Sequence, residues 1–263
     1  MTKQRIITRT VLLISFVSFF NDIASEMLYP VMPVYLRSIG FSILLIGILE
    51  GIAEATAGLS KGYFGNLSDM KQKRLPFVQV GYALSALSKP LMAIFIFPLW
   101  IFFARTLDRL GKGIRTGSRD AILSDETTME HKGKVFGFHR GLDTLGAAIG
   151  PALALVYLYF FPEQYRWLFF LAFIPGMAAI LITFLIREKK RSKPDKPSGK
   201  IHFLSYLSYW KQAGTGYRMV VAGLLLFTLF NKLNIKLQSI CLPKIIQAPI
   251  FQNLPIRHQS IIL

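Results

Sequence analysis

The sequence predicts an all-α membrane protein whose helices cross the bilayer several times. Of its 263 residues, 52% are hydrophobic, a share that soluble domains seldom reach because their surfaces need charge. Several segments of about 18 or more mostly apolar residues are long enough to span a bilayer as helices. The short loops between these segments are rich in Lys and Arg. Together these observations predict a polytopic six-helix bundle followed by an incomplete seventh helix.

Hydropathy and the charges of the flanking loops place six spans in order. The basic N-terminus leads into a span too long for a signal peptide, so we expect a retained first helix. The fourth span is the least apolar, and it is placed because the charged loops on either side require a crossing there. The six predicted spans are Val11–Leu36, Phe41–Phe64, Leu75–Phe97, Leu99–Ser118, Val135–Phe161 and Tyr165–Ile186.

The distribution of Lys and Arg predicts the orientation of the chain. The N-terminus, the loops after the second and fourth spans and the segment after the sixth are basic, whereas the opposite loops contain only Arg37 and Arg166. We therefore expect a cytoplasmic N-terminus. Residues 1–187 form the predicted transmembrane bundle, and residues 188–215 a cytoplasmic linker that begins with a charged, proline-containing stretch.

The last part of the chain departs from this pattern. The apolar run Met219–Phe230 is too short to span alone, since about 20 residues are needed. Residues 232–263 contain three prolines and no acidic residue, and they show no sustained apolar face. We interpret 216–231 as the start of a seventh helix and 232–263 as an atypical tail, and we expect a frameshift or an early stop.

Four carboxylates lie in the middle of the first two apolar spans. They are Asp22 and Glu26 in the first span and Glu50 and Glu54 in the second. A charge at the bilayer centre costs at least about 2.5–3.5 kcal/mol, so such residues usually line a cavity or a path for substrate and protons. Two alternatives stay open: Asp22 caps or pairs locally, and the two glutamates form a structural ion pair.

The fourth span carries both signs of charge on one helical face. Its cations are candidate partners for the carboxylates of the first and second spans, because buried charges must be paired. Asp143 in the fifth span is either a second protonation site or the partner of Arg140 or of a loop. The charged residues on the face of the fourth span are Arg105, Asp108, Arg109, Lys112 and Arg119.

Other patterns argue against further chemistry. The net charge of +17 could suggest nucleic-acid binding, but the basic residues belong to loops on one side of the membrane. His139 is expected at the membrane interface. With one cysteine and no nucleophile–base or metal-ligand spacing, we expect no enzyme activity, no cofactor and no metal site. A stripe of small residues in the second span is expected to pack against a helix, namely Gly47, Gly51, Ala55, Gly58 and Gly62.

The loop between the second and third spans resembles the cytoplasmic loop motif of the major facilitator superfamily. The motif is glycine-x-leucine-x-aspartate followed by a basic cluster, and the matching residues are Gly65, Leu67, Asp69, Lys73 and Arg74. Gln72 stands where a glycine is common. In the family the aspartate stabilises one conformation through an inter-helix charge contact, which implies that Asp69, with Lys73 and Arg74, forms a cytoplasmic gate.

Two further segments resemble motifs of the same family. In the fifth span, Gly141 followed by Gly150-Pro151 is similar to a glycine-proline motif often associated with antiporters. In the fourth span, either Arg105 or Arg109 corresponds to an arginine linked to proton coupling.

The resemblance implies the N-terminal half of a fold that has twelve helices in two six-helix halves. It further implies secondary active transport of a small solute by alternating access, coupled to protons, with efflux or antiport as one option. The expected location is the bacterial inner membrane. Three hypotheses compete: a half-length transporter that pairs with itself as a homodimer, an inactive truncated product, and a membrane interaction protein that transports nothing.

Overall fold

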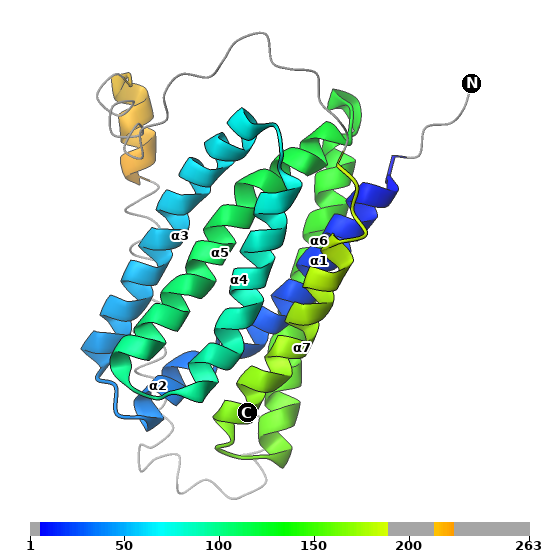
Figure 1. Cartoon of the computed structure of the whole chain (residues 1–263). Helices are drawn as coiled ribbons and strands as arrows, with labels where there is room; N and C mark the ends of the chain where they lie inside the picture. Colours follow the sequence, from blue (N-terminus) through cyan, green and yellow to red (C-terminus); the bar gives the residue numbers. More distant parts are fainter. Residues whose placement is uncertain (1–5, 189–212, 224–263) are drawn as a thin grey trace, which may run out of the picture. The chain divides into compact units, whose positions relative to one another are not determined.

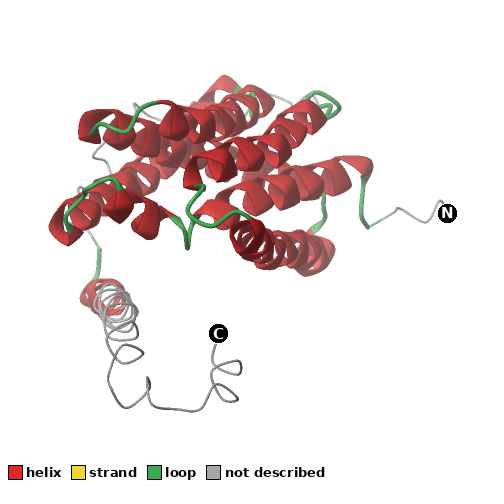
Figure 2. Ribbon diagram, turned by 90° about the horizontal axis from the view of Figure 1, so that it is seen from below, coloured by secondary structure: helices red, strands yellow, loops and turns green. Residues whose placement is uncertain are grey.

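The computed structural model describes residues 6–188 and 213–223, and the described part is helical with connecting loops and no strand (Figures 1 and 2). The five long helices that follow the first span match the predicted spans in order. The last of them, α7, ends before the predicted boundary at Ile186. The elements are α1 (Arg9–Leu28), α2 (Met32–Ser38), α3 (Ile43–Lys71), α4 (Leu75–Ile94), α5 (Pro98–Asp125), the short 3-10 helix η1 (Met129–His131), α6 (Lys132–Phe160) and α7 (Tyr165–Thr183).

The first predicted span is divided into two helices, which corrects the expectation of one unbroken helix. α1 ends at Leu28 and α2 begins at Met32. Pro30 lies in the break, because a proline lacks a backbone N–H and collides with the preceding helical turn. Pro33 occupies the first turn of α2, where a missing N–H has no helical acceptor to lose.

The contacts between helices relate the first three long helices to the last three. α1 packs on α6 and α7, α5 packs on α3 and α4, and α4 packs on α7. When α1 is exchanged with α5, α3 with α6 and α4 with α7, the same set of helix contacts results. This is expected for two three-helix repeats. Figure 1 shows α3, α5 and α4 side by side, with α1, α6 and α7 as the second group. The equivalent helices α1 and α5 contact each other little.

Glycines allow the closest helix approaches. A Cβ atom on Gly150 would lie 2.8 Å from the Ile23 carbonyl oxygen of α1, and one on Gly111 would lie 2.6 Å from the Gly81 carbonyl oxygen of α4. Such contacts leave no room for a side chain, so these glycines fix how near α6 lies to α1 and α5 to α4.

The small-residue stripe of the second span does not pack inside the bundle, which corrects the expectation stated above. A Cβ atom on Gly51 or Gly58 would meet nothing within 4 Å in the described chain. α3 and α6 also expose large apolar side chains, among them Leu44, Leu155 and Tyr159, with exposed fractions of 74%, 71% and 79%. These faces suit a lipid or protein environment rather than water.

Five segments of the described chain are long and apolar enough to cross a membrane. α5 is not among these five segments because of its charged residues, as the sequence indicated, yet it packs against both α3 and α4. The chain divides into two units, 1–203 and 204–263. In the second, residues 215–223 are helical. Residues 189–212 of the predicted linker and 224–263 lie outside the described residues.

Candidate functional site

A polar pocket lies among α1, α4 and α5. Its space, including the open mouth, amounts to about 360 Å³. α1 contributes two carboxylates, and α5 contributes cations from successive helical turns. The lining residues are Asp22, Ser25, Glu26, Tyr29, Ser85, Arg105, Asp108, Arg109, Lys112 and Arg115.

Two arginines of α5 are paired with the two glutamates of α3. Arg105 donates from Nε and Nη2 to the Glu50 carboxylate at 2.8 and 3.0 Å. Arg109 Nη2 lies 3.2 Å from Glu54 Oε1 and 3.9 Å from Glu50 Oε2. Both arginine side chains are buried, so the structural ion-pair alternative for the glutamates is the arrangement present here. A bidentate Arg–carboxylate pair also fixes the rotation of α5 against α3.

A buried lysine that the sequence analysis overlooked lies behind this pair. Lys89 of α4 is 1% exposed, donates to the Ser85 carbonyl oxygen at 2.8 Å, and lies 3.6 Å from Asp108 Oδ1. Asp108 also accepts a hydrogen bond from Ser85 Oγ at 2.6 Å and lies 3.4 Å from Arg105 Nη1. Asp108 is therefore held by two cations, and a chain of alternating charges runs from Lys89 to Glu50.

The carboxylates of α1 are placed differently from the expectation that the cations of α5 would pair with them. Asp22 accepts a 3.4 Å hydrogen bond from Asn21 Nδ2. No salt bridge to Asp22 or Glu26 occurs in the described part of the chain. The arginines turn instead toward α3, because α5 packs closely on α3 and makes few contacts with α1. The two carboxylates are thus brought to the pocket without a cationic partner within 4 Å among the described residues.

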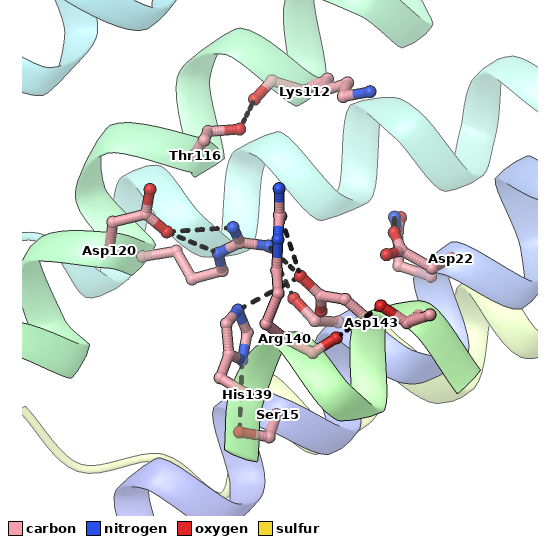
Figure 3. A network of polar contacts seen from close by, with 12 residues as sticks. Ser15, Asp22, Lys112, Thr116, Asp120, His139, Arg140 and Asp143 are labelled. Atoms are coloured by element: carbon pink, nitrogen blue, oxygen red, sulfur yellow. Dashed lines mark hydrogen bonds and ion pairs between the residues drawn. The ribbon is translucent and has the colours of Figure 1, made fainter. Parts of the chain in front are cut away.

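A second polar network connects α1, α5 and α6 (Figure 3). Arg119 donates to Asp120 and, at 2.8 Å, to Ser18 Oγ, and its Nη1 atom lies 3.9 Å from Asp143 Oδ2. Asp143 also lies 3.6 Å from Arg140 Nη1, so the expected Arg140 pairing is present alongside one from α5. Asp143 Oδ1 has no hydrogen-bond partner among the described residues.

His139, which was expected at the membrane interface, belongs to this network. Its side chain is buried, with Nδ1 3.2 Å from Ser15 Oγ and Nε2 3.6 Å from Asp143 Oδ2. Hydropathy places His139 near the end of a span, but α6 begins at Lys132, two turns earlier, and this carries the ring into the bundle.

A third cluster ties the helix ends together around Arg74, at the junction of α3 and α4. Arg74 pairs with Asp69 at 2.5 Å and with Asp125 of α5 at 2.5 Å. Glu188, which follows α7, accepts hydrogen bonds from the backbone N–H groups of Arg74 and Leu75 at 2.7 and 3.1 Å. Four elements therefore meet at one end of the bundle.

The remaining motif residues are less engaged. Lys73 is exposed and forms no salt bridge within the described residues. Gly65 approaches Gly117 of α5, and Leu67 is half-buried on α3. Gly141 is exposed, and a Cβ atom there would meet nothing within 4 Å in the described chain. Pro151 lies inside α6, which continues through it to Phe160.

The chemistry open to this arrangement is binding and charge transfer. In residues 6–188 and 213–223, no group of three or more His, Cys, Asp or Glu side chains is placed to hold a metal ion. Buried ion pairs can exchange partners, and unpaired carboxylates can take up protons. These are the properties of a membrane-embedded binding site.

Comparison with known proteins supports this description. Residues 14–253 match the sequence model of the Major Facilitator Superfamily. An uncharacterised MFS-type transporter of Methanocaldococcus jannaschii is 34% identical over 201 residues, covering 76% of this chain and 49% of that protein. The quinolone resistance protein NorA of Staphylococcus aureus is 24% identical, covering 67% of this chain and 46% of NorA. Citrate exporter 1 of Aspergillus niger is 23% identical, and the match covers 69% of this chain and 34% of the exporter.

Solved structures share the fold. A peptide transporter of the POT family in complex with sulfate matches with a TM-score of 0.62 at 17% identity, covering 91% of this chain and 52% of its own. A human organic anion transporter matches with a TM-score of 0.57 at 18% identity, and the match covers 68% of this chain and 47% of the transporter. The chain spans about half the length of the Methanocaldococcus relative and of these structures.

Proposed function

The chain belongs to the Major Facilitator Superfamily, and on that premise we propose that it moves a small solute across a membrane by alternating access. The pocket among α1, α4 and α5 is the proposed solute path. One observation carries this proposal: Asp22 and Glu26 line the pocket without a salt bridge within the described residues. Unpaired carboxylates at membrane depth are costly and are usually functional.

Asp22 and Glu26 are the proposed proton acceptors. Each can gain or lose a proton without breaking an ion pair, which makes its charge state responsive to the solute and to neighbouring charges. The charged groups that act on Asp22 are Asp143 of α6 and Arg115 and Arg119 of α5. Those that act on Glu26 are Asp22 and the α5 cations Lys112, Arg109 and Arg105. A change in protonation on α1 would thus alter the field along α5.

The ion pairs between α5 and α3 are the proposed link between protonation and movement. Arg105 and Arg109 are held by Glu50 and Glu54 in this conformation, and their guanidinium groups also line the pocket that Asp22 and Glu26 enter. When the α1 carboxylates are charged, they compete with the α3 glutamates for the same arginines. Asp108 and Asp143 stabilise the cations behind them.

The Arg74 cluster is the proposed cytoplasmic gate. It joins the ends of α3, α4 and α5 to the segment after α7 through Asp69, Asp125 and Glu188, so separating these ends requires breaking the charge contacts of the buried Arg74. The basic loops occur at the same end of the bundle, which favours the cytoplasmic side. We assign the gate to Arg74 rather than Lys73, which is exposed.

The proposed direction is export by proton antiport across the cytoplasmic membrane. Two relatives are named for export or resistance, namely citrate exporter 1 and NorA, and Gly150 of the glycine-proline motif lies against α1 beside Glu26. The solute path of this family lies between two six-helix halves, so a second half, either another copy or a further segment, is part of the proposal.

Transport by reconstituted protein tests the proposal. Proteoliposomes containing the full chain are exposed to a mixture of amino acids, organic acids and amines under an imposed pH gradient, and their contents are quantified by mass spectrometry. We expect at least one compound to accumulate with the gradient and not without it. The double variant Asp22→Asn/Glu26→Gln should abolish this accumulation, whereas Glu130→Gln, at an exposed position outside the pocket, should leave it intact.

Accumulation that is independent of the gradient would refute proton coupling and leave facilitated transport. If no compound accumulates for the unmodified chain, the proposal of an active transporter fails and the inactive-product hypothesis gains support.

A further inference from the structure

Three of the seven charged residues that line the pocket, Arg105, Asp108 and Arg109, are paired with a residue of opposite charge. Arg105 faces Glu50, Arg109 faces Glu54, and Lys89 faces Asp108, all with nitrogen–oxygen distances of 3.6 Å or less. These six residues come from α3, α4 and α5, and their charges sum to zero. Arg105, Asp108 and Arg109 line the pocket, and their three partners are not part of its lining. A solute beside this paired group encounters no net charge to neutralise.

Four charged residues of the pocket lining remain outside these ion pairs, and two of them are cations and two are carboxylates. Arg115 and Lys112 of α5 are the cations, and Asp22 and Glu26 of α1 are the carboxylates. None of the four forms a salt bridge with a residue of the described chain. The pocket therefore has a cationic side on α5 and an anionic side on α1.

Arg115 carries an unused donor inside the protein. Its side chain is 5% exposed, and its guanidinium lies 4.7 Å from the centre of the Tyr82 ring. Its Nη1 atom is buried without a hydrogen-bond partner among the described residues. A buried donor without an acceptor is destabilising unless something else supplies one. Because Arg115 lines the pocket, an anionic group of a bound solute can supply it.

The opposite charges are close enough to influence each other and are not in contact. Asp22 interacts electrostatically with Arg115, and Glu26 with Lys112, but no pair comes within 4 Å. The separation follows from the packing, because α1 and α5 are each held by other helices and contact one another little. The empty pocket thus keeps two charged sides apart instead of closing on itself.

A solute with a single charge would satisfy only one side. A simple anion would pair with Arg115 while its charge lay opposite two carboxylates, and a simple amine would meet the reverse. Charged groups left without partners inside a protein are destabilising. A solute with both charges can bridge the pocket, with each end against its complement.

We propose that the solute of this pocket is a small zwitterion, whose anionic group is bound by Arg115 and Lys112 and whose cationic group lies against Asp22 and Glu26. This inference rests on the proposed function and narrows its substrate class. The two ends are bound by different helices, α5 and α1, which belong to different three-helix repeats. The solute would therefore draw the two repeats together when it binds.

Matched compounds test the proposal on the full chain in lipid nanodiscs. The first set is leucine, 4-methylpentanoate and 3-methylbutylamine, which share a carbon skeleton and differ in charge. The second is phenylalanine, 3-phenylpropanoate and 2-phenylethylamine. Affinities are measured by the ligand-induced shift in melting temperature and by calorimetry. We expect at least one zwitterion to bind about tenfold or more tightly than both of its matched compounds, since each charge-assisted contact contributes a factor of that order.

Variants assign the two sides separately. Arg115→Gln should reduce the affinity for the zwitterion to that for the matched amine, and Asp22→Asn should reduce it to that for the matched acid. Lys112→Gln, at an exposed position, gives a second test of the α5 side should Arg115→Gln fail to fold. Lys134→Gln, which removes an exposed cation outside the pocket, should change nothing.

Three results would overturn the inference: a matched acid or amine that binds as tightly as the zwitterion, variants that weaken all three compounds equally, or no binding of either zwitterion. The transport proposal fails separately. If a matched acid accumulates under a pH gradient, the transport proposal holds and the inference of a zwitterionic solute is refuted. If a zwitterion binds but no compound accumulates, the inference of a zwitterionic ligand holds and the transport proposal is refuted.

Discussion

Replacing Asp108 with asparagine should destabilise the bundle strongly while leaving its shape intact. Asp108 lies 3.6 Å from Lys89 Nζ and 3.4 Å from Arg105 Nη1, and its carboxylate accepts a 2.6 Å hydrogen bond from Ser85. Asparagine keeps the volume and can still accept the bond from Ser85. The substitution therefore removes one buried negative charge and little else.

The magnitude follows from the distance and the burial. At 3.6 Å and an effective dielectric constant of about 20, two unit charges interact by roughly 5 kcal/mol. Breaking a buried pair by removing one partner typically costs about 3–5 kcal/mol, because the other charge is left uncompensated. Arg105 retains Glu50, whereas Lys89 is 1% exposed and keeps only the Ser85 carbonyl. We expect Asp108→Asn to lower the free energy of unfolding by about 3–5 kcal/mol.

Unfolding by sodium dodecyl sulfate in mixed micelles, followed by tryptophan fluorescence, measures this loss. The matched control is Asp120→Asn, which removes a carboxylate that is paired with Arg119 but 38% exposed, and it should cost no more than about 1 kcal/mol. The double variant Lys89→Met/Asp108→Asn should recover most of the loss, since replacing both members of a buried pair is often nearly neutral.

A small loss on Asp108→Asn, similar to that of the control, would refute the view that Lys89 depends on Asp108. A double variant no more stable than Asp108→Asn would refute it independently, because removing the Lys89 charge would then relieve no destabilisation.

Three further predictions concern helix packing, the α3–α4 turn and the gate. Gly150→Ala should cost about 1–3 kcal/mol, because its Cβ atom would lie 2.8 Å from α1 backbone atoms. Gly141→Ala on the same helix should be neutral or stabilising in the same micelle assay, and equal effects would contradict the packing. Gln72 has a left-handed backbone with φ 52°, so Gln72→Gly should stabilise the chain by about 1 kcal/mol, and a loss of stability would refute this. Arg74→Gln should speed proteolysis at the ends of α3 and α5, because the Arg74 side chain pairs there with Asp69 and Asp125, and an unchanged cleavage rate would exclude the gate cluster.

The fold followed from the sequence because most membrane helices are specified by length and hydropathy. Five spans are apolar enough to be found in this way, and α5 could be placed only from the charges of its flanking loops. The interruption of the first span was not foreseen. Pro30 is compatible with either a kinked helix or a break, and the choice depends on tertiary contacts that a single sequence does not reveal.

The sequence predicted which residues belong to the candidate site better than it predicted which of them form ion pairs. Helical periodicity shows that Arg105 and Arg109 share a face with each other, but it does not show which neighbouring helix that face meets. The sequence therefore left α1 and α3 as equal candidates, and the close packing of α5 on α3 decided between them. The same limitation misplaced the glycine stripe of α3, which faces away from the bundle.

Lys89 and Arg115 were missed for a different reason. A single lysine in an apolar span can extend its amine to the interface, so Lys89 gave no clear signal of burial. Its spacing of four residues from Ser85 was the available clue, because it places both on one face of α4. Arg115 lies in the charged second half of the fourth span, where hydropathy does not distinguish pocket from surface.

Solute-dependent proton movement is the most direct test of the central claim, that the α1 carboxylates couple protons to transport. A pH-sensitive dye inside proteoliposomes would report the internal pH after addition of a compound that the chain is found to accumulate. The account predicts a pH change that requires the compound, is lost in Asp22→Asn/Glu26→Gln and persists in Glu130→Gln. Solute movement with no pH change, or a pH change retained by the double variant, would contradict it.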